Sequence, residues 1–121
     1  MSKKKKIDPV PYGVLARDAW PSSLRHPAVK GVFVGGCVER GVGSSYRRVK
    51  AHTHIGGPHC GWICFLSRRW LDCEPLLLHE LAHAVTRERH VRTWREYLLA
   101  IGGTIKAVKG VMANYEQDHD S

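Results

Sequence analysis

Three polar side chains, His79, Glu80 and His83, stand in an otherwise apolar segment between Pro75 and Val85. They form the pattern H-E-x-x-H. Residues four positions apart lie on one face of an α-helix, about 6 Å from each other, so both imidazoles can bind one metal ion with the carboxylate beside it. Zinc accepts histidine nitrogen at about 2.0–2.1 Å. Because burying three unpartnered polar groups is costly, the pattern predicts a Zn²⁺ site with one ion per chain.

A catalytic zinc site needs a third protein ligand and an open position for water. His90 is the leading candidate. On a continuous helix it would lie about 10 Å beyond His83 along the axis, which is too far for a shared ion. The helix must therefore end, and residues 86–89 must form a turn that returns His90. Glu88 and Glu96 are the alternative ligands, although each is also placed to pair with an arginine on the next helix.

Two helices are expected to carry these groups. Asp72 or Glu74 can cap the first, which continues without a breaker to Val85. The second spans about 91–101, where apolar residues including Trp94 form one stripe and two glycines follow.

Ahead of these helices the pattern is that of a sheet. Apolar or alternating runs at 28–37, 45–55 and 61–67 predict three strands separated by glycine-containing turns. A short helix is expected at 12–20, between two prolines. The fold class is therefore α+β, with a three-stranded, largely antiparallel sheet packed on the H-E-x-x-H helix and the helix after it.

The 45–55 strand has two different faces. Four of its odd positions are compact and mostly apolar, namely Val49, Ala51, Thr53 and Ile55, and the even positions among them are the basic residues Arg48, Lys50, His52 and His54. Successive strand side chains point to opposite faces, so one face should meet the core and the other solvent or a ligand. The basic face could also hold an extended peptide by strand addition.

With 121 residues, the chain is long enough for one domain, at 12–121, preceded by a flexible basic arm at 1–11. No apolar run predicts a membrane span or a signal peptide. The four cysteines have irregular spacing, which is typical of free thiols in a reducing compartment, and we expect a cytoplasmic protein.

The cysteines do not predict a second metal site. On an extended strand Cys60 and Cys64 share a face but lie about 13 Å apart, too far to bind one tetrahedral ion. His59 and Cys73 complete no better set, and Cys37 and Cys64 are interpreted as core thiols.

The net charge is +8, from 19 basic and 11 acidic residues. Residues 1–56 hold 11 basic and 3 acidic groups, so the entire excess lies there. Such a field attracts polyanions, and we expect contact with DNA without sequence preference. The candidate contact residues are Arg48, Lys50, Arg87 and Arg89; a solvated charged surface is the alternative interpretation.

The segments Leu78-His79-Glu80-Leu81-Ala82-His83-Ala84 and His90-Val91-Arg92-Thr93-Trp94-Arg95 together resemble the SprT-like zinc metalloproteases, which include the Spartan-type proteases. The resemblance covers about residues 62–103. It implies a small zincin-like domain in which three histidines bind zinc, Glu80 is the catalytic base, and the substrate is a protein or peptide, in several members one associated with DNA.

Several differences from that family leave substrate recognition open. Val91 follows the third histidine where the family commonly has glycine, and no cysteine-rich zinc ribbon follows. Six residues separate His83 from His90, which disfavours the metzincin pattern, and Glu80 disfavours the YbeY-like endoribonucleases. An ImmA-like protease that cleaves a repressor partner, with a downstream carboxylate as third ligand, is one alternative. A non-catalytic basic DNA-binding module with structural zinc is the other. The sequence does not indicate an oligomeric state.

Overall fold

The computed structural model describes residues 13–42 and 50–103. Its strands are β1 (Gly13–Val14), β2 (Gly31–Val34), β3 (Gly36–Cys37), β4 (Gly41–Val42), β5 (Ala51–Thr53) and β6 (Trp62–Phe65). Its α-helices are α1 (Arg68–Leu71), α2 (Glu74–Thr86) and α3 (Arg92–Ala100). Two short 3₁₀ helices, Arg17–Ala19 and Ser22–Leu24, precede β2.

The main sheet has four strands in the order β1-β2-β6-β5, and β3 and β4 form a separate two-stranded hairpin. The α+β class is confirmed. The expected three-stranded, largely antiparallel sheet is wrong, because the sheet has four strands and its two central strands are parallel. β2 and β6 are parallel neighbours, while β1 and β5 pair antiparallel at the two edges. The chain between β2 and β6 contains both the β3–β4 hairpin and β5, which gives it the length that a parallel pair requires.

The expected helix at 12–20 is also wrong where the structure describes it. Gly13 and Val14 pair with β2 as a strand, and only three residues then form a 3₁₀ turn. The Trp20 indole N–H donates to the Leu15 carbonyl at 3.1 Å, and both side chains are buried in the core. Pairing with the sheet edge and burial of Trp20 outweigh a weak local helix signal.

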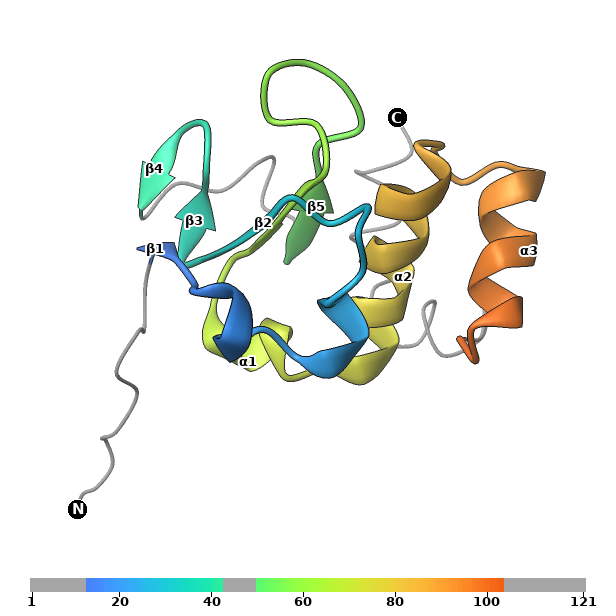
Figure 1. Ribbon diagram of the computed structural model, residues 1–121, viewed down its shortest axis with the longest axis horizontal. Helices are drawn as coiled ribbons and strands as arrows, with labels where there is room; N and C mark the ends of the chain where they lie inside the picture. Colours follow the sequence, from blue (N-terminus) through green and yellow to red (C-terminus); the bar gives the residue numbers. More distant parts are fainter. Residues whose placement is uncertain (1–12, 43–49, 104–121) are drawn as a thin grey trace.

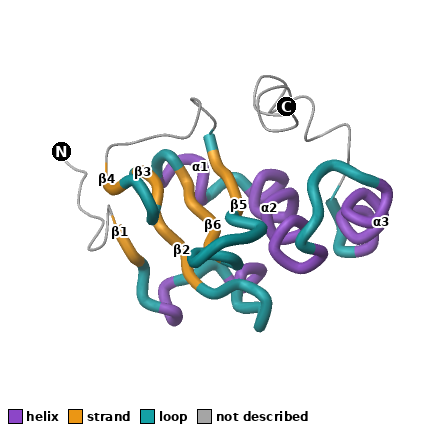
Figure 2. Tube along the Cα trace, turned by 90° about the horizontal axis from the view of Figure 1, so that it is seen from above, coloured by secondary structure: helices purple, strands orange, loops and turns teal. Residues whose placement is uncertain are grey.

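The central strands are covered on both faces. Val32, Val34, Ile63 and Phe65 belong to the main core, which α2 and α3 close. The alternate residues Phe33 and Cys64 form a smaller core with Cys37 on the opposite face, under the β3–β4 hairpin. Figure 1 shows the hairpin and the two helices at opposite ends of the molecule, and Figure 2 shows α2 between the sheet and α3. The sheet thus separates two buried compartments.

Both predicted helices are confirmed within a few residues, but the expected cap is wrong: Cys73, not Asp72 or Glu74, is the N-cap of α2, and its side chain makes no capping hydrogen bond. Pro75 lies in the first turn of α2, where its missing N–H costs no hydrogen bond. Eight consecutive or near-consecutive side chains of α2 are buried, including all three polar ones. The proposed 1–11 arm lies outside the described residues. Among the residues that the structure describes, no helix is long and apolar enough to cross a membrane.

Candidate metal centre

The three histidines predicted from the sequence meet at one point beside α2. The Nε2 atom of His79 lies 3.2 Å from Nε2 of His83 and 3.1 Å from Nε2 of His90. The ligand atoms of all three lie within 4.8 Å of one another. His79 and His83 are fully buried, and His90 is partly buried.

These separations suit a shared metal ion. Two nitrogens bound to tetrahedral zinc at about 2.0–2.1 Å are separated by about 3.3–3.4 Å. The distances from His79 to its two partners fall just below that value. The donor set therefore passes the geometric test for a three-histidine metal site.

The turn that returns His90 is present. α2 ends at Thr86, and Arg87 caps it in the left-handed conformation, with φ 58° and ψ 29°. The Thr86 hydroxyl donates to the Ala82 carbonyl at 2.7 Å and accepts the Glu88 N–H at 3.2 Å. Glycine usually occupies this left-handed position, but this chain has arginine there. The Thr86 hydroxyl supplies hydrogen bonds to backbone groups of the turn.

The same turn orients one imidazole. His83 Nδ1 lies 2.6 Å from the Glu88 carbonyl oxygen. A carbonyl only accepts, so Nδ1 carries the proton and the Nε2 lone pair is left facing the other two histidines. A backbone carbonyl behind a histidine is a common support for a metal ligand because it fixes the tautomer and the ring plane.

Trp94, on α3, contacts all three imidazoles. Its ring centroid lies 4.9 Å from that of His79, 5.1 Å from that of His83 and 4.6 Å from that of His90. Its indole N–H donates to the His79 carbonyl at 3.3 Å. Helix α3 therefore supplies an apolar wall that fixes the three rings and excludes water from one side of them.

Glu80 is held by Thr53, which was expected from the sequence only to face the core. The Thr53 hydroxyl, on β5, lies 2.6 Å from Oε1 of Glu80 and 3.2 Å from the Glu80 carbonyl oxygen. The other carboxylate oxygen, Oε2, lies 3.9 Å from His79 Nε2. The fully buried carboxylate thus faces the three histidines from a fixed position. A threonine on the apolar face of a strand gave no sequence signal for this contact.

The alternative carboxylate ligands lie elsewhere. Oε2 of Glu96 accepts a hydrogen bond from Nε of Arg92 at 2.9 Å, and both side chains are exposed. Glu88 is also exposed and contributes its carbonyl to the turn. Among the described residues the group that could hold an ion beside α2 consists of the three histidines alone.

A second group of candidate ligands lies under the β3–β4 hairpin. From the sequence, its two cysteines were expected to be core thiols only. Cys37, His52, His54 and Cys64 place their ligand atoms within 4.8 Å of one another. His52 is only 7% exposed, so the basic face of β5 is buried at its centre rather than open to solvent. One ion per chain was expected from the sequence, but the described residues contain two groups of candidate metal ligands.

Burial dominates the protonation of this second group. It lowers the pKa of His52 to about 3, with smaller contributions in the same direction from His54 and Arg40. Burial also lowers the pKa of His54, partly opposed by Glu39. It raises the pKa of Cys64 far above its usual range, against the effect of the Val38 N–H. Near neutral pH both imidazoles are thus neutral and offer lone pairs, while Cys64 is a thiol until a cation replaces its proton.

A pocket of about 260 Å³ opens beside the second group, and its lining does not include the three histidines of the first group or Glu80. Thr53, which holds Glu80, lines it together with Arg89, from the turn before His90. Cys37 and His54, from the second group, line it as well. A ligand in this pocket would therefore contact the second group itself, but only residues adjacent to the histidine group.

Of the four basic residues proposed to contact DNA, the structure describes Lys50, Arg87 and Arg89. Arg48 lies outside the described residues. The Lys50 ammonium lies 5.0 Å from the centroid of the Trp70 ring, on α1. Arg87 and Arg89 follow the end of α2.

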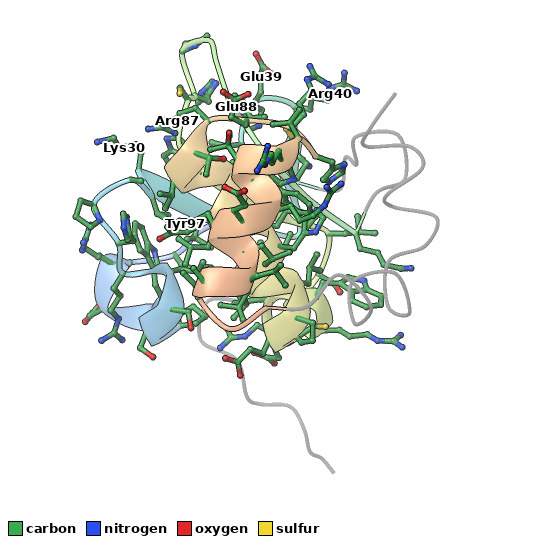
Figure 3. All side chains as sticks on the ribbon, turned by 90° about the vertical axis from the view of Figure 1, so that its right-hand side faces the viewer. Lys30, Glu39, Arg40, Arg87, Glu88 and Tyr97 are labelled. Atoms are coloured by element: carbon green, nitrogen blue, oxygen red, sulfur yellow. The ribbon has the colours of Figure 1, made fainter. Side chains whose placement is uncertain are left out.

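Both signs of charge are present at the end of the molecule where α2 terminates. Figure 3 shows Lys30, Arg40 and Arg87 there together with Glu39 and Glu88. The structure therefore offers no uniformly basic patch from these labelled residues.

Comparisons of the chain with models of known protein families, with curated proteins and with solved structures gave no match. The geometry of the site is therefore the basis for assigning a function to this chain.

Proposed function

We propose that this protein is a zinc-dependent metallopeptidase. The observation that carries the proposal is the convergence of the Nε2 atoms of His79, His83 and His90, with the Glu80 carboxylate fixed beside them. Three imidazoles and an adjacent carboxylate that is not itself a ligand are the groups that a hydrolytic zinc site requires.

In this proposal the three histidines hold the ion. Zinc, when bound, would lower the pKa of a water molecule and polarise the carbonyl of the substrate. Glu80 would accept the proton from the attacking water and then donate it to the amine that leaves as the C–N bond breaks. The Thr53 hydroxyl donates a hydrogen bond to Oε1 of Glu80, and Oε2 is directed towards the histidines, where these proton transfers would take place.

The pocket and β5 are the proposed binding surface for the peptide. Within the described residues β5 pairs with β6 on one side only and is the edge strand nearest α2. An extended peptide could add to such an edge through main-chain hydrogen bonds, as proposed from the sequence. Arg89 lines the pocket with Thr53 and is our candidate for a second donor to the developing oxyanion.

The third ligand supports the SprT-like hypothesis over the ImmA-like one. His90 belongs to the histidine group, whereas the nearest downstream carboxylate, Glu96, is paired with Arg92 at the surface. Trp94, which belongs to the second of the two segments that carry the resemblance, lies one turn after His90 and contacts all three rings. We further propose protein or peptide substrates, including proteins associated with DNA, on the basis of the net charge of +8.

The decisive experiment separates metal binding from chemistry. Glu80→Gln should retain zinc and fold but lose peptide hydrolysis, because the amide keeps the shape of the carboxylate and cannot act as the base. Glu88→Gln, an exposed glutamate in the adjacent turn, is the matched control and should stay active. Cleavage of a broad peptide library by the zinc-loaded proteins, read by mass spectrometry, avoids any assumption about sequence preference. Equal activity of zinc-loaded Glu80→Gln and wild type would reject the proposed role.

A further inference from the structure

Four soft or borderline ligands converge on the face of the sheet opposite α2. Cys37 lies on β3, His52 on β5 and Cys64 on β6, and His54 follows the end of β5. The ligand atoms of all four lie within 4.8 Å of one another. They come from segments spread over residues 37–64, and each segment is held in place by the sheet or by the hairpin.

The strand register explains why they meet. His52 and Cys64 are direct partners across the antiparallel β5–β6 pair, so their side chains leave the sheet on the same face. His54, two residues after His52, continues on that face, and the two imidazole centroids lie 5.0 Å apart. The β3–β4 hairpin then brings Cys37 over them.

The spacing within the group suits a tetrahedral ion. For zinc with a thiolate at about 2.3 Å and an imidazole nitrogen at about 2.0–2.1 Å, the expected sulfur to nitrogen distance is about 3.6 Å. The Cys37 Sγ atom lies 3.6 Å from Nε2 of His54. We propose that Cys37, His52, His54 and Cys64 bind a second zinc ion, distinct from the ion proposed at the histidine group.

The surroundings of the four residues fit a structural ion. The Val38 N–H donates to Cys64 Sγ at 3.4 Å, an interaction that stabilises a metal-bound thiolate. Both cysteines are almost completely buried, packed against Phe33, Val38 and Trp62. Four protein ligands leave no open position for water, so this site would be closed and structural rather than catalytic. The pocket lined by Cys37, His52 and His54 gives an ion a route to the site.

A purely apolar interpretation accounts less well for the same residues. Two thiols alone would pack as small hydrophobic groups, but this core also contains the imidazole of His52 beside them. An ion would give both imidazoles and both sulfurs a common partner. It would also link β5 and β6 of the main sheet to the β3–β4 hairpin, at a point where each of these strands has only two to four residues.

Metal stoichiometry and a cobalt spectrum test the proposal on the intact protein. Wild type purified under reducing conditions and reconstituted with zinc should bind two equivalents. Reconstituted with Co²⁺, it should show an intense near-ultraviolet band from thiolate-to-cobalt charge transfer, because only this group contains sulfur ligands. This measurement needs no substitution and is independent of the folding of any variant.

Substitutions then show which of the two ligand groups binds each equivalent of zinc. Cys64→Ser and Cys37→Ser should each reduce the stoichiometry to about one equivalent and remove the sulfur band. Cys60→Ser is the matched control, since its sulfur bonds the Ile55 carbonyl outside the group, and it should keep both. A variant with both His79→Ala and His83→Ala should keep one equivalent and the sulfur band.

Two outcomes would overturn the proposal. One is a wild-type protein that binds a single equivalent and shows no sulfur band with cobalt. The other is loss of the sulfur band in the double histidine variant while circular dichroism shows an intact fold. Neither outcome decides whether the histidine group hydrolyses peptides, so the second site can fail while the proposed function stands.

Discussion

Replacing His90 by alanine should sharply weaken zinc binding at the histidine group. Structural zinc sites with four protein ligands have apparent binding free energies of about 10–16 kcal/mol, or roughly 2.5–4 kcal/mol per ligand. His90 Nε2 lies 3.1 Å from His79 Nε2, at the position of a full ligand. Its loss should therefore raise the dissociation constant roughly 60- to 700-fold. The group would retain His79 and His83, which alone are too few to hold zinc tightly.

Glu96→Ala is the matched control. Glu96 lies one helical turn after Arg92, forms an exposed ion pair with it and is absent from the histidine group. Such a surface pair contributes at most about 1 kcal/mol, so its removal should leave zinc affinity unchanged. Competition against a chromophoric chelator, fitted with two classes of site, measures both variants. If Glu96→Ala lost the metal while His90→Ala kept it, the assignment of the third ligand and the SprT-like hypothesis would both be wrong.

Two further predictions concern the proposed base and the charge of the chain. Thr53→Val should lower kcat roughly 10- to 160-fold with zinc content unchanged, because a hydrogen bond to a charged group contributes about 1.5–3 kcal/mol. Thr53→Ser should restore kcat, since it returns the hydroxyl to Glu80; a Thr53→Val protein with wild-type kcat would show that the contact does not position the base. Deletion of residues 3–6 should weaken DNA binding only in part, and the affinity of the intact chain should fall steeply between about 50 and 200 mM salt. Undetectable binding at the lower salt would remove DNA from the hypothesis, and complete loss on deletion would confine the binding to the four lysines at positions 3–6.

Local patterns were sufficient to predict α2, α3 and the first group of candidate metal ligands. The 3.6-residue period, a proline in the first turn and the spacing of His79 and His83 are all properties of one short segment. The end of the helix followed from distance alone, because His90 cannot reach the ion on a continuous helix. What the sequence did not indicate was how the turn is made. Arg87 adopts the left-handed conformation, and Thr86 supplies the hydrogen bonds around it.

The sheet was predicted less well because strand order depends on contacts between distant residues. Adjacent strands in the sequence suggested antiparallel neighbours, but β6 lies between β2 and β5 and runs parallel to β2. The second ligand group was missed for the same reason. Cysteine spacing along the chain correctly excluded a Cys60 and Cys64 pair, yet the true partner of Cys64 is His52 across the sheet. The pattern His-x-His at 52 and 54 was the available signal, and it was interpreted as a solvent or ligand face.

The alternation of β5 places the two proposed sites on opposite sides of one short strand. Thr53 points to Glu80 on the α2 face, while His52 points to Cys64 on the hairpin face. Adjacent residues of a strand share one backbone, so an ion that fixes His52 also restricts the position of the Thr53 hydroxyl. Since that hydroxyl holds Oε1 of the proposed base, the structural ion would act on hydrolysis through the position of Glu80 and not through its own chemistry. Under these proposals Cys64→Ser should reduce kcat in the same way as Thr53→Val, with the zinc at the histidine group retained.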